Sequence, residues 1–136
     1  MAPIVEFVVD GTPISAQASG HSRTRWKAKV AAAAIGALPA GHALVADPVG
    51  ATVIYFYVDT DLDLDNILKP ILDALNGVVF LDDSQVVNII AAHRDLAGEY
   101  LLADASPILV SRVAAGVGGG DFVFVAIELA TVNAVL

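Results

Sequence analysis

The chain has 136 residues, no cysteine, and 15 acidic residues against seven Lys and Arg, which gives a formal net charge of −8. The absence of cysteine excludes disulfide bonds, zinc–thiolate sites and thiol nucleophiles, and no apolar run reaches the roughly 18 residues that a membrane span requires. The length suits a single domain over residues 1–136, and no signal-peptide pattern is seen, so we expect a cytoplasmic protein. Hydrophobic residues make up 57% of the chain, which indicates a buried subunit interface.

Short strands and helices follow one another without the strict rhythm of a parallel strand–helix–strand fold. The pattern predicts strands over 3–10, 51–58, 85–93 and 121–130, the third of them largely buried. It predicts helices over 23–38, 66–75 and 106–115. Ser22 or Thr24 could cap the first helix, which follows a loop over 11–22, and Pro70 is expected in the first turn of the second. The expected class is therefore α+β, with a mixed β-sheet packed with helices.

Four aspartates alternate with other residues directly after the second predicted strand: Asp59, Asp61, Asp63 and Asp65. If the strand continued through them, their side chains would share one face, about 6.5 Å apart. Carboxylates that close together stay hydrated, shift their pKa values or hold a cation. Oxygen ligands of this kind favour Mg²⁺ or Mn²⁺.

Three interpretations of the acidic run can be compared. A calcium loop of the EF-hand type opens with the same alternation, but Pro70 or Leu72 stands where its closing glutamate is required. A solvated charge run at a sheet edge explains the alternation, but not the second acidic pair, Asp82 and Asp83. A carboxylate site for divalent ions would serve phosphodiester hydrolysis, in which ions activate water and stabilise the leaving oxygen. The residues alone leave the last two interpretations open.

One lysine and one basic segment accompany these acids. Lys69 lies four residues after Asp65 and four before Asp73, so a helix would place all three on one face. The lysine could form a surface salt bridge, or it could stabilise a phosphate beside a metal site. The basic segment carries four cations at helical spacing: Arg23, Arg25, Lys27 and Lys29. They form either a solvated helix face or a surface that contacts DNA phosphates, with Trp26 in the core.

Residues 63–77 read Asp-Leu-Asp-Asn-Ile-Leu-Lys-Pro-Ile-Leu-Asp-Ala-Leu-Asn-Gly, and residues 81–86 read Leu-Asp-Asp-Ser-Gln-Val. Together they resemble the RusA family of Holliday-junction resolvases, through the pattern D-x-D-N-x-x-K-x-x-x-D-x-L-x-G followed by D-D-x-Q-V. A looser similarity extends to the first and last predicted strands and to the basic segment. The resemblance implies a RusA-like fold and a homodimer.

The resemblance also implies an activity, that of a Mg²⁺-dependent endonuclease that cuts four-way DNA junctions by paired symmetric nicks, with Mn²⁺ as a substitute ion. By their match to the motif, Asp63, Asp65 and Asp83 are the metal-site aspartates and Lys69 is the catalytic lysine. A metal-activated water would attack the phosphodiester while Lys69 stabilises the developing charge. Supporting roles are expected for Asp61, Asn66, Asp73 and Asp82, and DNA binding for Arg23, Arg25, Lys27 and Lys29. Asn66 would orient Asp65 or cap the helix. The competing class is a non-catalytic metal- or DNA-binding protein that keeps the motif for structure.

Overall fold

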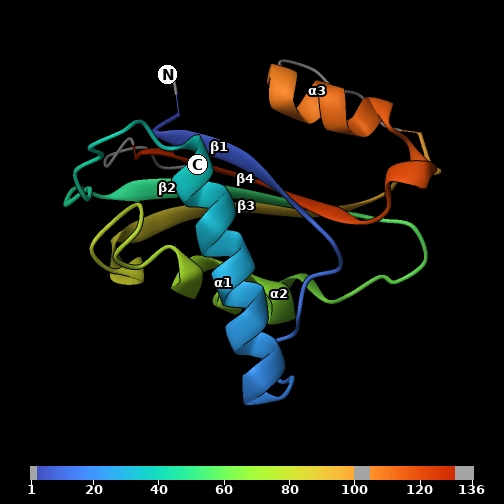
Figure 1. Cartoon of the computed structure of the whole chain (residues 1–136), viewed down its shortest axis with the longest axis horizontal. Helices are drawn as coiled ribbons and strands as arrows, with labels where there is room; N and C mark the ends of the chain where they lie inside the picture. Colours follow the sequence, from blue (N-terminus) through green and yellow to red (C-terminus); the bar gives the residue numbers. More distant parts are fainter. Residues whose placement is uncertain (1–2, 100–104, 131–136) are drawn as a thin grey trace.

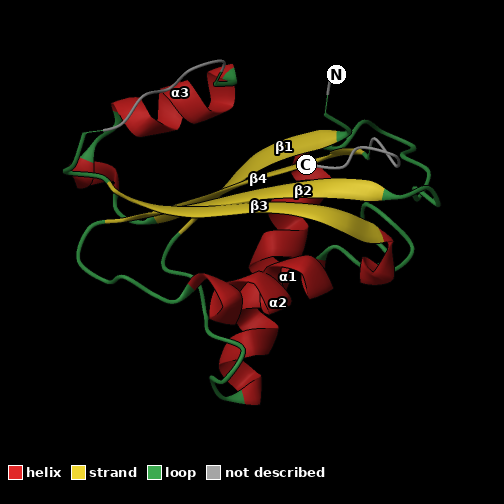
Figure 2. Ribbon diagram, turned by 180° about the vertical axis from the view of Figure 1, so that it is seen from behind, coloured by secondary structure: helices red, strands yellow, loops and turns green. Residues whose placement is uncertain are grey.

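The computed structural model describes residues 3–99 and 105–130, which form a four-stranded sheet with helices on both faces (Figure 1). The strands are β1 (Val5–Asp10), β2 (Val49–Tyr57), β3 (Val86–Asp95) and β4 (Phe122–Leu129), in the spatial order β1-β4-β2-β3. Strand β4 is antiparallel to β1 and β2, whereas β3 is parallel to β2. Helices α1 (Gly20–Ala37) and α2 (Leu64–Ala74) lie on one face and α3 (Pro107–Ala114) lies on the other (Figure 2). The predicted α+β class with a mixed sheet is confirmed.

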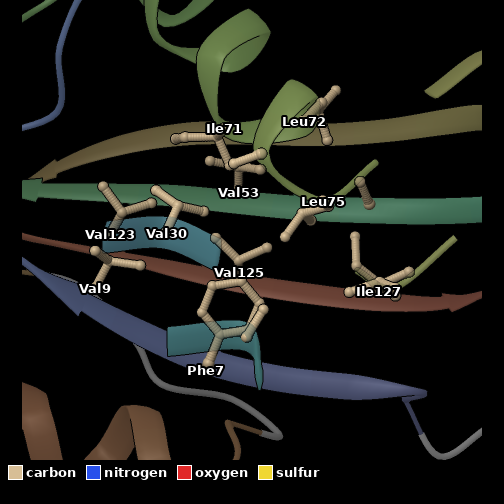
Figure 3. Packing of buried hydrophobic residues seen from close by; sticks show 14 of the residues in the cluster. Phe7, Val9, Val30, Val53, Ile71, Leu72, Leu75, Val123, Val125 and Ile127 are labelled. Atoms are coloured by element: carbon tan, nitrogen blue, oxygen red, sulfur yellow. The ribbon is translucent and has the colours of Figure 1, made fainter. Parts of the chain in front are cut away.

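The main core lies between the sheet and helices α1 and α2 (Figure 3). Alternate strand residues face it because successive side chains of a strand point to opposite sides; they include Val5, Phe7, Val9, Val53, Val123, Val125 and Ile127. Helix α1 contributes a stripe of Trp26, Val30 and Ala34, which confirms the core position predicted for Trp26. A smaller cluster on the other face contains Leu109 of α3 with Phe56, Leu96, Phe122 and Phe124.

Helix α1 begins earlier than the sequence predicts. Ser19 is its N-cap, since its hydroxyl accepts a hydrogen bond from the N–H of Ser22 at 3.2 Å. Thr24 lies within the helix, where its hydroxyl donates to the carbonyl of Gly20. The capping role predicted for Ser22 or Thr24 is therefore wrong, and the preceding loop ends at Ser19.

Pro70 lies inside α2 rather than in its first turn, because this helix begins at Leu64. A proline has no N–H to donate to the carbonyl four residues earlier, which here belongs to Asn66. That carbonyl instead accepts the N–H of Ala16 at 2.7 Å. The proline thus leaves an acceptor on α2 to which the loop before α1 is anchored.

The prediction that the third strand is largely buried is wrong for the single chain. Strand β3 stands at an edge of the sheet, and its residues Val87, Ile89 and Ile90 are 52%, 47% and 64% exposed. A continuous apolar, β-branched run is typical of a strand that is covered on both faces, but its place in the strand order is a tertiary property. Within the described residues, no helix has the length and apolar character to span a membrane.

Candidate active site

The chain leaves the sheet before the first aspartate of the acidic run. Strand β2 ends at Tyr57, residues 58–63 form a connection without regular secondary structure, and Asp65 lies in the first turn of α2. The predicted single strand face of four aspartates is therefore wrong. Aspartate is a poor strand former and is favoured at the beginning of a helix. Asp63 is the N-cap of α2, so the predicted capping role of Asn66 is also wrong.

Asp121, immediately before β4, holds the start of this connection in place. Its carboxylate accepts hydrogen bonds from the hydroxyls of Thr12 and Tyr55, at 2.7 and 2.9 Å, and from the N–H of Val58, at 2.8 Å. The Tyr55 hydroxyl also contacts the carbonyl of Thr60. Burial, followed by the hydrogen bond to Asp121 and its charge, raises the pKa of Tyr55 above its ordinary value. Sequence reasoning missed Asp121, whose only signal is an acid placed between a glycine turn and an apolar strand.

Lys69 of α2 links the two halves of the motif. Its Nζ lies 2.9 Å from Oδ1 of Asp73 and 3.6 Å from Oδ2 of Asp83. Asp83 opens the 3₁₀ turn η1 (Asp83–Gln85) that leads into β3. The hydrogen bond to Asp73, then the charges of Asp73 and Asp83, raise the pKa of Lys69, so its ammonium form is favoured. Lys69 therefore forms the surface salt bridge considered above and also lies beside the second acidic pair.

Asp82 has different partners from its neighbour. Its carboxylate accepts the N–H of Ser84 at 3.1 Å, and the Gln85 side-chain oxygen accepts the N–H of Asp82 at 2.9 Å. The hydrogen bonds from Ser84 lower the pKa of Asp82. Asp82 thus caps η1, and Asp83 is the member of the pair that faces Lys69.

Asp61 is joined to the edge of the sheet. Its carboxylate pairs with Nδ1 of His93 on β3, and the His93 ring lies 5.9 Å from the ring of Tyr57. This pair connects the middle of the acidic connection to β3, the strand that η1 introduces. A supporting role for Asp61 would therefore act through the position of the connection.

The carboxylates near Lys69 offer the oxygen ligands that a hard divalent ion prefers. Within residues 3–99 and 105–130, no three His, Asp or Glu side chains are close enough to hold one ion together. Mg²⁺ does not require such a cage, because it commonly keeps several waters and takes one or two protein carboxylates. Asp65 lies one helical turn from Lys69, about 6 Å between Cβ atoms, and Asp63 makes no side-chain capping hydrogen bond. Asp63, Asp65 and Asp83 therefore match a partly hydrated ion in the chemistry of their oxygen ligands, but within the described residues they are not gathered closely enough for all three to hold one ion.

Helix α1 divides the four predicted DNA-binding cations between two flanks. Arg23 and Lys27 line a notch that also contains Lys69 and Asp73. Arg25 and Lys29 line a separate hollow together with Thr12, Ile14 and Trp26. Residues two apart on a helix point about 200° away from each other, so the cations cannot form one continuous surface. Only the Arg23 and Lys27 flank adjoins the candidate active site.

A comparison with known protein families matches the part of the chain that contains the candidate active site. A sequence model of the family described as endodeoxyribonuclease RusA matches residues 17–99, which is more than half of the chain. The matched range contains α1, β2, α2, η1 and β3, and with them Lys69 and Asp83, whereas Asp121 lies outside it. None of the curated proteins compared with the chain matches it.

Proposed function

Because the chain belongs to the RusA family of endodeoxyribonucleases, we propose that it resolves four-way DNA junctions by paired symmetric nicks in a Mg²⁺-dependent reaction. The observation that carries this proposal is the 3.6 Å approach of Lys69 to Asp83. It brings together the helical half of the motif and the acidic pair that follows it. Cations and carboxylates arranged in this way are suited to binding a phosphodiester and the ion that activates its hydrolysis.

Asp63, Asp65 and Asp83 are the residues that would hold the ion, and Mn²⁺ would serve in place of Mg²⁺ because both prefer oxygen ligands. When bound, such an ion supplies activation of water and neutralisation of phosphate charge. Asp63 and Asp65 lie at the N-terminus of α2, where both side chains are exposed. Both carboxylates would therefore be accessible to a hydrated cation.

Lys69 would stabilise the negative charge that develops on the phosphate. Its raised pKa keeps the side chain protonated, so it would donate hydrogen bonds and would not act as a general base. Asp73, 2.9 Å away, orients the ammonium group. The side chain is 66% exposed, which leaves it accessible to a DNA backbone.

A homodimer is part of the proposal, because two symmetric nicks need two active sites related by a two-fold axis. Support comes from the exposed apolar residues of β3, chiefly Val87, Ile89 and Ile90. An edge strand with unpaired backbone groups and apolar side chains favours pairing with another chain. We place the interface between copies on this edge.

One observation favours the alternative of a non-catalytic metal- or DNA-binding protein. Within the part of the chain that the structure describes, three potential ligands are not gathered around one point. A protein that keeps the motif only for structure would show the same salt bridge between Lys69 and Asp73. The two functions differ in whether DNA is cut.

Labelled four-way junction, flap and plain duplex DNA, incubated in Mg²⁺, in Mn²⁺ and in EDTA, separate these functions. The proposal predicts symmetric nicks in the junction with either ion and none in EDTA. Retained junction binding without cleavage, over a range of low salt concentrations and with both ions, would identify the binding protein.

A further inference from the structure

A notch between α1 and α2 is lined in part by Lys69 and does not include Asp83. Its volume is about 260 Å³, and its lining includes Ala16, Arg23, Lys27, Lys69, Pro70 and Asp73. Sites that enclose a drug-sized ligand usually measure about 300–1,000 Å³. The notch is thus too small for a large ligand but has room for a group larger than a single water.

The notch is positively charged although the chain is acidic. Three cations, Arg23, Lys27 and Lys69, line it with one carboxylate, Asp73, so its formal charge is +2 in a chain of net charge −8. Among the ion pairs of the described residues, Lys69 has acidic partners but Arg23 and Lys27 have none. Two cations without acidic partners, held beside a third, form a suitable site for an anion.

Backbone hydrogen bonds hold the notch in shape. A guanidinium N–H of Arg23 donates to the carbonyl of Ala16 at 2.9 Å, which fixes the head group of the arginine. The N–H of Ala16 donates in turn to the carbonyl of Asn66 at 2.7 Å, the acceptor that Pro70 leaves without a helical partner. The arginine, the loop and α2 are therefore joined before any ligand arrives, which lowers the entropic cost of binding.

We propose that this notch binds one phosphodiester of the DNA backbone adjacent to the one that is cut, with Arg23 and Lys27 as its phosphate-binding residues. The inference rests on the proposed function, because Lys69 belongs both to the notch and to the candidate active site. The remaining N–H groups of Arg23 present a planar fork to phosphate oxygens, and Lys27 adds a point charge. Arg25 and Lys29, on the other flank of α1, contribute only general attraction for DNA.

Two variants that remove the same charge from the same helix test this assignment. Affinity for four-way junction DNA is measured in EDTA at several salt concentrations for Lys27→Gln and Lys29→Gln. Loss of a phosphate contact in Lys27→Gln weakens binding about tenfold and reduces the slope of log affinity against log salt by about 0.9. Lys29→Gln produces a clearly smaller change in both. Equal effects of the two substitutions would overturn the proposal.

A second measurement does not depend on cleavage. The dinucleotide d(TpT), titrated into the isotope-labelled protein, shifts the backbone amide resonances of Ala16 and Thr24, whereas thymidine, which lacks the phosphate, does not. Absent shifts, or the same shifts with thymidine, would overturn the proposal. If d(TpT) binds in the notch but no junction is cut, the phosphate-binding role of the notch is supported and the proposed function is wrong. If junctions are cut and Lys27→Gln has the same effect as Lys29→Gln, the proposed function is supported and the phosphate-binding role of the notch is wrong.

Discussion

Lys69 of α2 lies 3.6 Å from Asp83 in the turn that leads into β3. This contact joins a helix on one face of the sheet to the edge strand, and it places an ammonium group beside the second acidic pair. Asp73 holds the same ammonium group from one helical turn further along α2. The lysine is therefore the point at which the separated parts of the motif meet.

Replacement of this lysine tests its role directly. Lys69→Ala is expected to slow single-turnover cleavage of a four-way junction by about 10²- to 10³-fold, the usual effect of losing a group that stabilises transition-state charge. The thermal unfolding temperature should hardly change, because exposed ion pairs contribute little to stability. Asp73→Asn, which keeps the cation and a hydrogen-bond acceptor but removes the negative charge beside it, is the matched control and should slow cleavage much less. An unaltered rate in Lys69→Ala would remove the lysine from the mechanism.

The sequence predicts the elements of the fold better than their arrangement. The alternating burial of β1 and the core position of Trp26 follow from local patterns, and the structure shows both. The edge position of β3 is not a local property, because an apolar strand has the same composition at an edge as in the centre. The interior position of Pro70 was also beyond local rules, since its cost is offset by a hydrogen bond from Ala16, a distant residue.

The candidate site was predictable to a similar degree. Spacing on one helix places Lys69 beside Asp73, as expected for residues four apart. The approach of Asp83 depends on the path of the chain after α2, and the capping of η1 by Asp82 distinguishes two adjacent acids that look equivalent in sequence. Asp121, the residue before β4, holds the start of the acidic connection through Tyr55 and Val58, so no motif spacing could have indicated it.

The hydrogen bond from the N–H of Ala16 to the carbonyl of Asn66 can be tested by giving residue 70 an N–H that competes for the same carbonyl. In Pro70→Ala the new N–H would donate to the carbonyl of Asn66 and displace the N–H of Ala16. The amide of Ala16 should then exchange with solvent faster, while amides in the α2 core become no less protected. Hydrogen exchange followed by NMR measures both. Unchanged protection of Ala16 would show that the loop is held by other contacts.

Tyr55 makes stability depend on alkaline pH. Because its pKa is raised from 10.0 in the folded chain, the neutral form is stabilised by folding, fully so below pH 10.0. This contribution is lost as the pH rises above that value toward the raised pKa. The free energy of unfolding in urea should therefore fall above pH 10.0 in the wild type and fall less in Tyr55→Phe, which at neutral pH is less stable by about 1 kcal/mol. Equal alkaline losses in both proteins would contradict the role of this hydroxyl.

The proposed dimer interface can be tested with two isoleucines of similar exposure. Ile90 on β3 is 64% exposed and Ile35 on α1 is 61% exposed. Ile90→Lys should convert the dimer to a monomer in sedimentation velocity experiments, because a lysine on an edge strand opposes pairing with another chain. Ile35→Lys should leave the dimer intact. Dissociation by Ile35→Lys alone would move the interface from the edge strand to α1.

In the proposed mechanism DNA cleavage depends on an ion bound by the acids around Lys69, and Asp65→Asn removes one of these acids. The substitution keeps the size of the side chain and removes its charge, at an exposed position in the first turn of α2. Single-turnover cleavage of a four-way junction in Mg²⁺ and in Mn²⁺ is measured beside the circular dichroism spectrum and the oligomeric state. We expect no detectable cleavage by a variant that is otherwise folded and assembled as the wild type is. Cleavage by Asp65→Asn at the wild-type rate would contradict this mechanism.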